Sequence, residues 1–210
     1  MNILLTDILT CPRCGPGYGL ILVADRMESR RVLDGWLGCP NCRERYPVRG
    51  GVADLRAGAS DGVGEATDEA SGSEAYAWRL AALMGVTEGP GFTLIAGPGV
   101  GAAGWIAGAI EGLEVIALGD WVGGGVEEAG VSRVASGAAL PFYDRSILAV
   151  ALTGGTAAAL LGEAVRVLAP TGRLVLDPAP ADSRERLAAA GLHVLVEGDG
   201  AIVAARGVAV

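Results

Sequence analysis

Four cysteines near the beginning of the chain have a spacing that suits the binding of a metal ion. They form two Cys-x-x-Cys pairs, Cys11 with Cys14 and Cys39 with Cys42, separated by 24 residues. Two residues between cysteines allow both sulfur atoms to turn toward one ion, and two such pairs supply the four thiolates of a tetrahedral zinc site. Because four thiolates leave no open coordination position, the spacing predicts a structural zinc ion rather than a catalytic one.

The same cysteines could instead form two disulfides, serve a redox role or have no function. We expect a cytoplasmic protein, because Asp7 interrupts the short apolar start, no basic segment precedes it, and no run reaches the ~18 apolar residues of a membrane helix. Thiols stay reduced in that compartment, which favours a metal site over disulfides. The only histidine, His193, lies in a predicted strand, so we expect it in the core or at a sheet edge rather than at the metal.

The charge of the chain divides it into unlike parts. Residues 1–56 carry eight arginines and six acids, whereas residues 57–210 carry eight arginines and eighteen acids, and the chain has no lysine. We expect no nucleic-acid binding by the acidic part, since binding to a phosphate backbone depends on cations, and the small positive excess of the first part gives little support for it there. Residues 57–74 contain mainly Gly, Ala, Ser and acids, which predicts a flexible linker, with an acidic docking strip over 61–74 as the alternative.

After position 74 the sequence alternates between strand-like and helix-like segments. Between Ala157 and Leu168 apolar residues recur at steps of three and four, which places them on one helix face. This pattern predicts an α/β sheet flanked by helices, with a C-terminal antiparallel hairpin across Gly198-Asp199-Gly200. The predicted strands are 92–96, 114–118, 131–135, 147–152, 173–177, 192–197 and 201–205. The predicted helices are 75–84, 102–111, 156–169, ended by Pro170 and Gly172, and 183–190, with a capping box of Asp182 and Glu185 and a C-cap at Gly191.

The first part of the chain is similar to a known family. The segment from Leu5 to Cys14 (LTDILTCPRC) resembles the opening of small zinc-ribbon proteins that bind and activate methyltransferases. The segments Cys39–Cys42 (CPNC) and Tyr46–Leu55 (YPVRGGVADL) are similar to the second knuckle of that family and the strand after it. The resemblance implies a ribbon that covers an apolar surface of a methyltransferase and pairs with an edge of its sheet; related ribbons are also fused ahead of bacterial methyltransferase domains.

Residues 76–206 resemble a class I S-adenosylmethionine (SAM) methyltransferase. The similarity lies in Gly97-Pro98-Gly99-Val100-Gly101 after a strand, in the stretch 139–142 (ALPF) and in the stretch 161–174 (LGEAVRVLAPTGRL). We therefore predict a Rossmann-like methyltransferase domain over 75–210, after a zinc ribbon over 1–56 and the linker. In such enzymes a glycine turn lets SAM approach the backbone, and carboxylates bind its amine, its ribose and its adenine.

The acidic positions implied by this resemblance hold other residues here. Ile95 stands two residues before Gly97, Gly119 ends the second strand with Asp120 one place later, Ser136 stands on the adenine side and Leu148 in the fourth strand. Each lost charged contact weakens binding by roughly 1.5–3 kcal/mol. We predict no catalytic residues, with Thr153 and Thr156 acting as helix caps.

Three functions remain open from the sequence. The first is a non-catalytic binding or assembly subunit, with Trp78, Trp105 and Trp121 as candidate contacts to a partner protein or to another copy of the chain, although tryptophan is more often buried. The second is an active methyltransferase in which Gly97, Gly99, Gly101 and Asp120 bind SAM. The third is a dinucleotide-binding protein, because Gly97-x-Gly99-x-x-Ala102 follows a strand and Asp120 lies about 20 residues further on.

Overall fold

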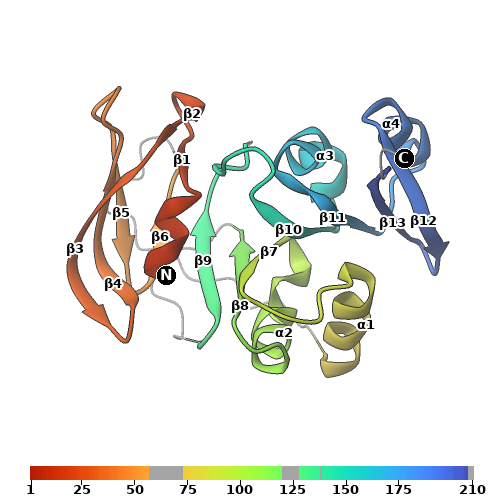
Figure 1. The fold of residues 1–210 in the computed structure, drawn as a ribbon, viewed down its shortest axis with the longest axis horizontal. Helices are drawn as coiled ribbons and strands as arrows, with labels where there is room; N and C mark the ends of the chain where they lie inside the picture. The colour runs from red at the N-terminus through yellow and green to blue at the C-terminus, as the bar shows by residue number, and fades with distance from the viewer. Residues whose placement is uncertain (57–72, 120–127, 138, 208–210) are drawn as a thin grey trace.

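One large mixed β-sheet joins the N-terminal and C-terminal parts of the described chain (Figure 1). The computed structural model describes residues 1–56, 73–119, 128–137 and 139–207. Within these ranges the main sheet has eleven strands in the order β12-β13-β11-β10-β7-β8-β9-β6-β5-β4-β3. The N-terminal strands form one end of this sheet and the C-terminal hairpin forms the other (Figure 1).

The N-terminal part is a small antiparallel unit. A short 3₁₀ helix precedes two strands that pair with each other, and four further strands belong to the main sheet. The β3–β4 hairpin turns at Ser29 and Arg30, whose φ angles of 45° and 67° suit the tight turn of a twisted ribbon. The elements are η1 (Ile3–Asp7), β1 (Thr10–Cys11), β2 (Gly15–Gly19), β3 (Ile21–Glu28), β4 (Arg31–Gly38), β5 (Arg45–Arg49) and β6 (Val52–Asp54).

The larger part has the α/β architecture that the sequence predicted. Strands β9, β8, β7, β10 and β11 are parallel neighbours, and β13 lies antiparallel between β11 and β12. This arrangement confirms the predicted Rossmann-like sheet of parallel strands with a C-terminal antiparallel hairpin. The elements are α1 (Glu74–Met84), β7 (Gly91–Ala96), η2 (Pro98–Ala102), α2 (Ala103–Ala109), β8 (Leu113–Leu118), β9 (Val131–Ala135), β10 (Ile147–Thr153), α3 (Thr156–Val167), β11 (Leu168–Asp177), α4 (Ser183–Ala189), β12 (Leu192–Gly198) and β13 (Ala201–Arg206).

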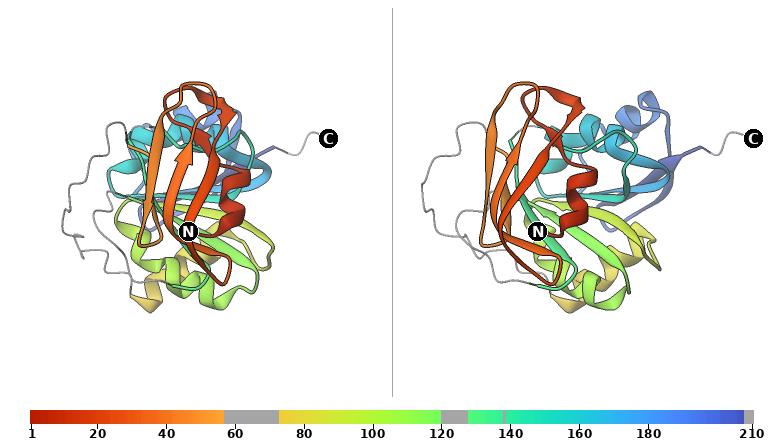
Figure 2. Two further views of the ribbon diagram at one scale, coloured as in Figure 1. Left: turned by 90° about the vertical axis from the view of Figure 1, so that its left-hand side faces the viewer. Right: turned by 60° about the vertical axis from the view of Figure 1, so that its left-hand side comes forward.

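Helices cover both faces of the parallel strands (Figures 1 and 2). On one face α1 and α2 pack through Leu80 and Ile106 against Ile95 and other apolar strand residues. On the other face α3, α4 and the N-terminal unit share one continuous apolar cluster. That shared cluster includes Leu5, Leu9, Leu37, Val48 and Leu55 from the N-terminal unit together with Ile116, Val134, Phe142, Leu161 and Leu187. None of the described helices is long and apolar enough to cross a membrane.

Some predicted boundaries and caps are wrong. Helix α3 ends at Val167 instead of 169, and β11 begins at Leu168. Pro170 and Gly172, which were predicted to end the helix, lie within β11. Asp182 is the N-cap of α4, but its side chain makes no capping hydrogen bond, so the predicted capping box does not form. Ser73 instead caps α1, accepting a hydrogen bond from Tyr76 N–H at 3.2 Å. The predicted linker falls almost wholly outside the described residues, as does the acidic strip within it.

The two parts are joined by strand pairing. Strand β6 runs parallel to β9, and the Leu55 N–H continues the pairing by donating to the Ala135 carbonyl at 2.8 Å. The aligned pairs are Val52 with Arg133, Ala53 with Val134 and Asp54 with Ala135. Because β5 and β4 pair in turn with β6, the N-terminal strands extend the α/β sheet in cis.

A buried charged cluster lies at this joint. The Glu114 carboxylate on β8 accepts hydrogen bonds from Arg31 at 2.6 Å, from Asn2 at 2.9 Å and from Ser132 at 2.6 Å. Arg31 also donates to the Val131 carbonyl. The side chains of Arg31 and Glu114 are only 11% and 8% exposed, so this ion pair is shielded from solvent and tied to both parts.

The first prediction concerns the removal of one partner from this cluster. Glu114→Leu leaves Arg31 buried without its carboxylate, and we expect the free energy of unfolding to fall by about 3–5 kcal/mol. The double variant Arg31→Met with Glu114→Leu removes both charges, and we expect it to recover most of that loss. Denaturant unfolding measures both values.

The exposed pair Arg26–Asp34 is the matched control, since its side chains are 57% and 40% exposed. Arg26→Met should change the free energy of unfolding by less than about 1 kcal/mol. A Glu114→Leu loss no larger than that of the control contradicts a structural role for the buried pair.

Candidate metal centre and glycine turn

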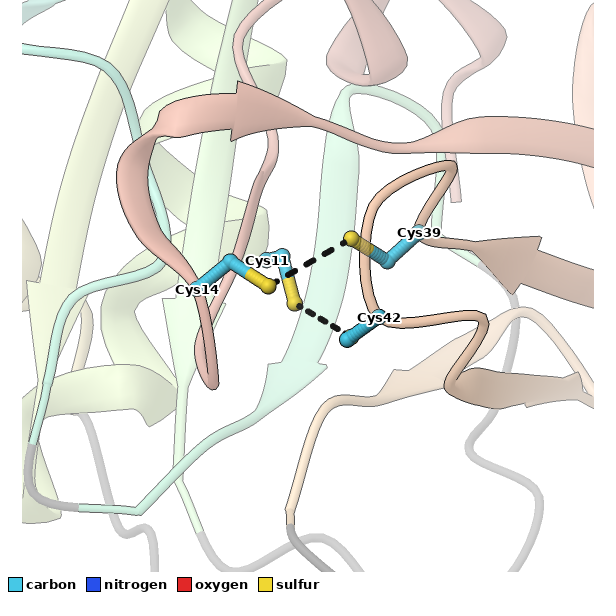
Figure 3. Close-up of side chains that lie close together, drawn as sticks. All are labelled: Cys11, Cys14, Cys39 and Cys42. Atoms are coloured by element: carbon cyan, nitrogen blue, oxygen red, sulfur yellow. Dashed lines mark hydrogen bonds between the residues drawn. The ribbon is translucent and has the colours of Figure 1, made fainter.

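The four cysteines converge on one point (Figure 3). All four sulfur atoms lie within 4.8 Å of one another. The Sγ atoms of Cys11 and Cys42 are 3.7 Å apart, and those of Cys39 and Cys14 are 3.8 Å apart. Cys11 ends β1 and Cys39 follows β4, so the two knuckles are brought together by strands far apart in the sequence.

Neighbouring polar groups orient the sulfur atoms. The Tyr46 hydroxyl lies 3.4 Å from the Cys11 sulfur, and the Asn41 amide donates to the Cys14 sulfur at 3.3 Å. Asn41 belongs to the second knuckle and Cys14 to the first, so this contact links the two. The sequence indicated the four cysteines but neither of these supporting residues, because a tyrosine and an asparagine carry no metal-binding pattern of their own.

The thiols differ in their readiness to ionise. Burial disfavours the Cys39 thiolate, but the N–H groups of Cys42 and Asn41 outweigh it and lower the pKa of Cys39 to about 7. For Cys42, the Glu44 N–H favours the thiolate, but burial and the three neighbouring cysteine side chains raise its pKa to about 12. Thiols this close cannot all ionise together unless a cation compensates their charge.

This donor set fits zinc. Sulfur separations of 3.7 and 3.8 Å are far beyond a disulfide bond of about 2.05 Å and suit four ligands around one ion. The four cysteines are free thiols in the structure. The remaining candidate, His193, lies on the exposed side of β12 at the far edge of the sheet, as the sequence suggested for an edge residue.

The glycine turn after β7 is contacted by side chains of the chain itself. Gly97 has φ of 89°, which suits glycine, and Gly99 is buried. The Gly99 N–H donates to the Thr153 hydroxyl at 2.8 Å, and that hydroxyl donates to the Ala96 carbonyl at 2.7 Å. A Cβ atom on Gly99 would meet the hydroxyls of Thr153 and Tyr76, each at 3.0 Å. Gly99 therefore has no room for a side chain.

Thr153 and Thr156 do not act as the predicted helix caps. The N-cap of α3 is Gly155, with no side-chain capping bond. The Thr156 hydroxyl donates to the carbonyls of Thr153, at 2.8 Å, and Ala96, at 3.3 Å. Both threonines thus tie the end of β10 to the end of β7.

The positions where SAM enzymes place acids offer no carboxylate among the described residues. Ile95 is fully buried under α2, and Gly119 follows β8 without a side chain. The Ser136 hydroxyl donates to the Ala139 carbonyl at 2.8 Å, and Leu148 packs beside Gly91. Asp120 lies outside the described residues, whereas the third glycine of the turn, Gly101, is half-buried within η2. Among the described residues, these four positions therefore supply no carboxylate to the amine, ribose or adenine of SAM.

Comparisons with known proteins bear on both parts of the chain. Residues 2–51 match the family model of Trm112p-like proteins, which confirms the resemblance of the N-terminal ribbon. No curated protein matches the sequence. Three solved structures have similar folds. The first is a chain from the complex of the Haloferax volcanii Trm112 methyltransferase activator with a protein assigned as a methyltransferase; it is 21% identical, with a TM-score of 0.46, and the match covers 57% of this chain and 68% of that chain. The others are geranyl diphosphate methyltransferase with SAM (17% identity, TM-score 0.47, 64% of this chain and 85% of that chain) and the [4+2]-cyclase SpnF (17% identity, TM-score 0.45, 65% of this chain and 65% of that chain).

The second prediction concerns the metal. Elemental analysis of the purified protein should find one zinc per chain, and Cys39→Ser should lower that content, because three thiolates and a hydroxyl bind zinc less well than four thiolates. Acidification should release the zinc, since protons compete with the metal for the sulfur atoms.

Tyr18→Phe is the control for this experiment, because Tyr18 lies exposed on β2 of the same unit and contributes no ligand. Wild-type protein with far less than one zinc per chain contradicts the site.

Proposed function

We propose that this chain is a non-catalytic binding or assembly subunit, in which a Trm112p-like zinc ribbon is built into a methyltransferase-like domain. The proposal rests on the glycine turn after β7, which is contacted by side chains of the chain itself. A SAM enzyme uses the backbone of this turn for its cofactor, but here the Gly99 N–H already donates to Thr153, and the Tyr76 hydroxyl lies against the same glycine.

The surroundings of the turn support the same conclusion. Arg79 on α1 pairs with Asp177 at the end of β11 at 2.6 Å. Burial raises the pKa of the Tyr76 hydroxyl, and the Asp177 carboxylate adds to this effect, so Tyr76 stays neutral. These contacts hold α1 over the carboxyl ends of the strands, where ligands of open α/β sheets bind.

The ribbon has a structural role in this proposal. Its strand β6 and its apolar face are already occupied by β9 and by the shared core, so they serve the domain to which they are covalently attached. The zinc ion holds the two knuckles together, since four thiolates leave no position for a substrate.

Two exposed tryptophans are the best candidates for contact with another protein. Trp78 on α1 is 51% exposed and Trp105 on α2 is 49% exposed. Both helices cover the same face of the sheet, and they pack against each other. Tryptophan is enriched where proteins bind one another, so we assign this face to a protein partner or a second copy of the chain. Trp121, the third candidate, lies outside the described residues.

The third prediction tests the loss of cofactor binding. Calorimetric titration of the zinc-loaded protein with SAM, and separately with S-adenosylhomocysteine, should give no dissociation constant below about 1 mM. Three absent charged contacts at roughly 1.5–3 kcal/mol each weaken a micromolar site about a thousandfold or more, since about 1.4 kcal/mol corresponds to a factor of ten.

Micromolar binding of either ligand contradicts the proposal and supports the second function, an active methyltransferase. Asp120→Ala then becomes the next variant, because Asp120 is the predicted ribose ligand. Loss of binding in that variant assigns the ribose contact.

The fourth prediction concerns assembly. Light scattering on purified protein, alone and with any co-purified chain, should detect a stable complex rather than a monomer. Trp78→Ser and Trp105→Ser should each weaken it about fivefold or more, as expected for an aromatic residue at the centre of an interface.

Leu195→Ser is the matched control, because Leu195 is similarly exposed, at 53%, but lies on β12 at the far edge of the sheet. A monomeric wild-type protein with no bound chain, or equal effects of all three substitutions, contradicts the assignment of this face.

A further inference from the structure

One segment of the α/β domain, Ala139–Asp144, contacts the ribbon directly before the first metal ligand. The Thr10 N–H donates to the Pro141 carbonyl at 2.8 Å, and the Tyr143 N–H donates to the Ile8 carbonyl at 2.9 Å. Between these bonds Leu9 forms an antiparallel bridge with Phe142, and both side chains are fully buried. Thr10 is followed by Cys11, so the contact lies next to the metal centre.

The same segment is held from its other side by α3. The Arg166 guanidinium donates to the carbonyls of Leu140 and Phe142, each at 2.7 Å. The Glu163 carboxylate accepts the Leu140 N–H at 3.1 Å. One arginine therefore fixes two alternate carbonyls through two separate nitrogen atoms held in a rigid plane, whereas a lysine offers a single ammonium nitrogen on a flexible chain.

Two carboxylates keep this arginine in place. Arg166 pairs with Glu163 at 2.7 Å and with Asp144 at 2.8 Å, and its side chain is 21% exposed. The hydrogen bond from Arg166 holds the pKa of Glu163 below its usual value, so Glu163 is charged at neutral pH. Each terminal nitrogen of the guanidinium thus donates both to a carboxylate and to a carbonyl of the segment, and one of the two carboxylates, Asp144, belongs to the segment itself.

The segment also leads back toward the carboxyl end of β9. The Ala139 carbonyl accepts a hydrogen bond from Ser136, the residue that follows that strand. A continuous set of contacts thereby connects Cys11, residues 8–10, residues 139–144 and Arg166 to the edge of the sheet where ligands of this fold bind.

We propose that the metal centre and the 139–144 segment are energetically coupled, with Arg166 as the positioning residue. Zinc fixes Cys11 and with it the backbone of residues 8–10, which then orders the segment. Coupling between two sites is reciprocal, so a segment fixed by Arg166 also strengthens zinc retention. This inference goes beyond the proposed function, because it holds whether or not the domain binds SAM.

The test measures both directions of the coupling in the full-length protein. Arg166→Met should accelerate zinc transfer to an excess of a chromogenic chelator about fivefold or more. Loss of coupling at the lower end of the typical range weakens equilibrium zinc binding about fivefold, and affinity differences between variants fall mainly on the dissociation rate. In the reverse direction, zinc removal should increase hydrogen exchange of residues 139–144 more than that of β10, which serves as the internal reference.

Arg186→Met is the matched control. Arg186 also donates to a backbone carbonyl, that of Ala158 at 3.0 Å, and lies 3.7 Å from Asp182, but it is on α4. Arg166→Lys keeps the positive charge but loses the two separate guanidinium nitrogens that contact Leu140 and Phe142, so we expect an intermediate rate of zinc transfer.

Zinc transfer at the wild-type rate in folded Arg166→Met, or equal acceleration in Arg186→Met, overturns the coupling. Unchanged exchange of residues 139–144 after zinc removal also overturns it. If Arg166→Met fails to fold, Arg166→Lys and the exchange experiment on wild-type protein still decide the outcome.

Discussion

The pairing of β6 with β9 is the contact on which the rest of the structure depends. It places the ribbon in line with the α/β sheet, so that one apolar cluster contains residues of both parts, among them Leu5 and Leu187. A small metal-stabilised unit buries too little apolar surface to be very stable alone, and the open edge of a parallel sheet exposes unpaired backbone groups. When the two parts are joined, the ribbon gains buried apolar surface and the edge of the parallel sheet gains a paired strand.

The glycine turn of the α/β domain is contacted by side chains of the chain itself. The turn does not depend on a ligand for its hydrogen bonds, because Thr153 satisfies both the Gly99 N–H and the Ala96 carbonyl. A glycine-rich sequence therefore need not indicate a cofactor, since glycine is also required where two backbone segments approach closely. Here the end of β10 lies against Gly97. The residue that bonds to the turn is Thr153, which lies more than fifty positions away in the sequence.

The sequence predicted the elements well where the signal was local. The apolar spacing of α3, the end of the first helix at residue 84 and the Asp199-Gly200 hairpin all follow from rules that act within a few residues. The cysteine spacing likewise indicated the metal centre. The resemblance implied that the ribbon pairs with an edge of the sheet, but the strands and side chains that form the joint could not be predicted, because β6 has only three residues and Arg31 pairs with Glu114 across 83 positions. The roles of Thr153 and Arg166 were missed for the same reason, since their partners lie far away in the sequence.

The buried Arg31–Glu114 pair is better explained as fixing the register of β6 against β9 than as strengthening the attachment of the ribbon to its domain. The ribbon is covalently attached to its domain, so its effective concentration is high and strong attraction is not needed to keep it bound. A three-residue parallel strand, however, specifies its alignment weakly, and a slip of one residue would turn its apolar side chains to the wrong face. A buried charge must find its partner or remain uncompensated, which penalises every misaligned arrangement. The hydrogen bonds from Asn2 to Glu114 and to Ser132 add to this penalty. The cluster thus selects the one register in which the ribbon also meets residues 139–144.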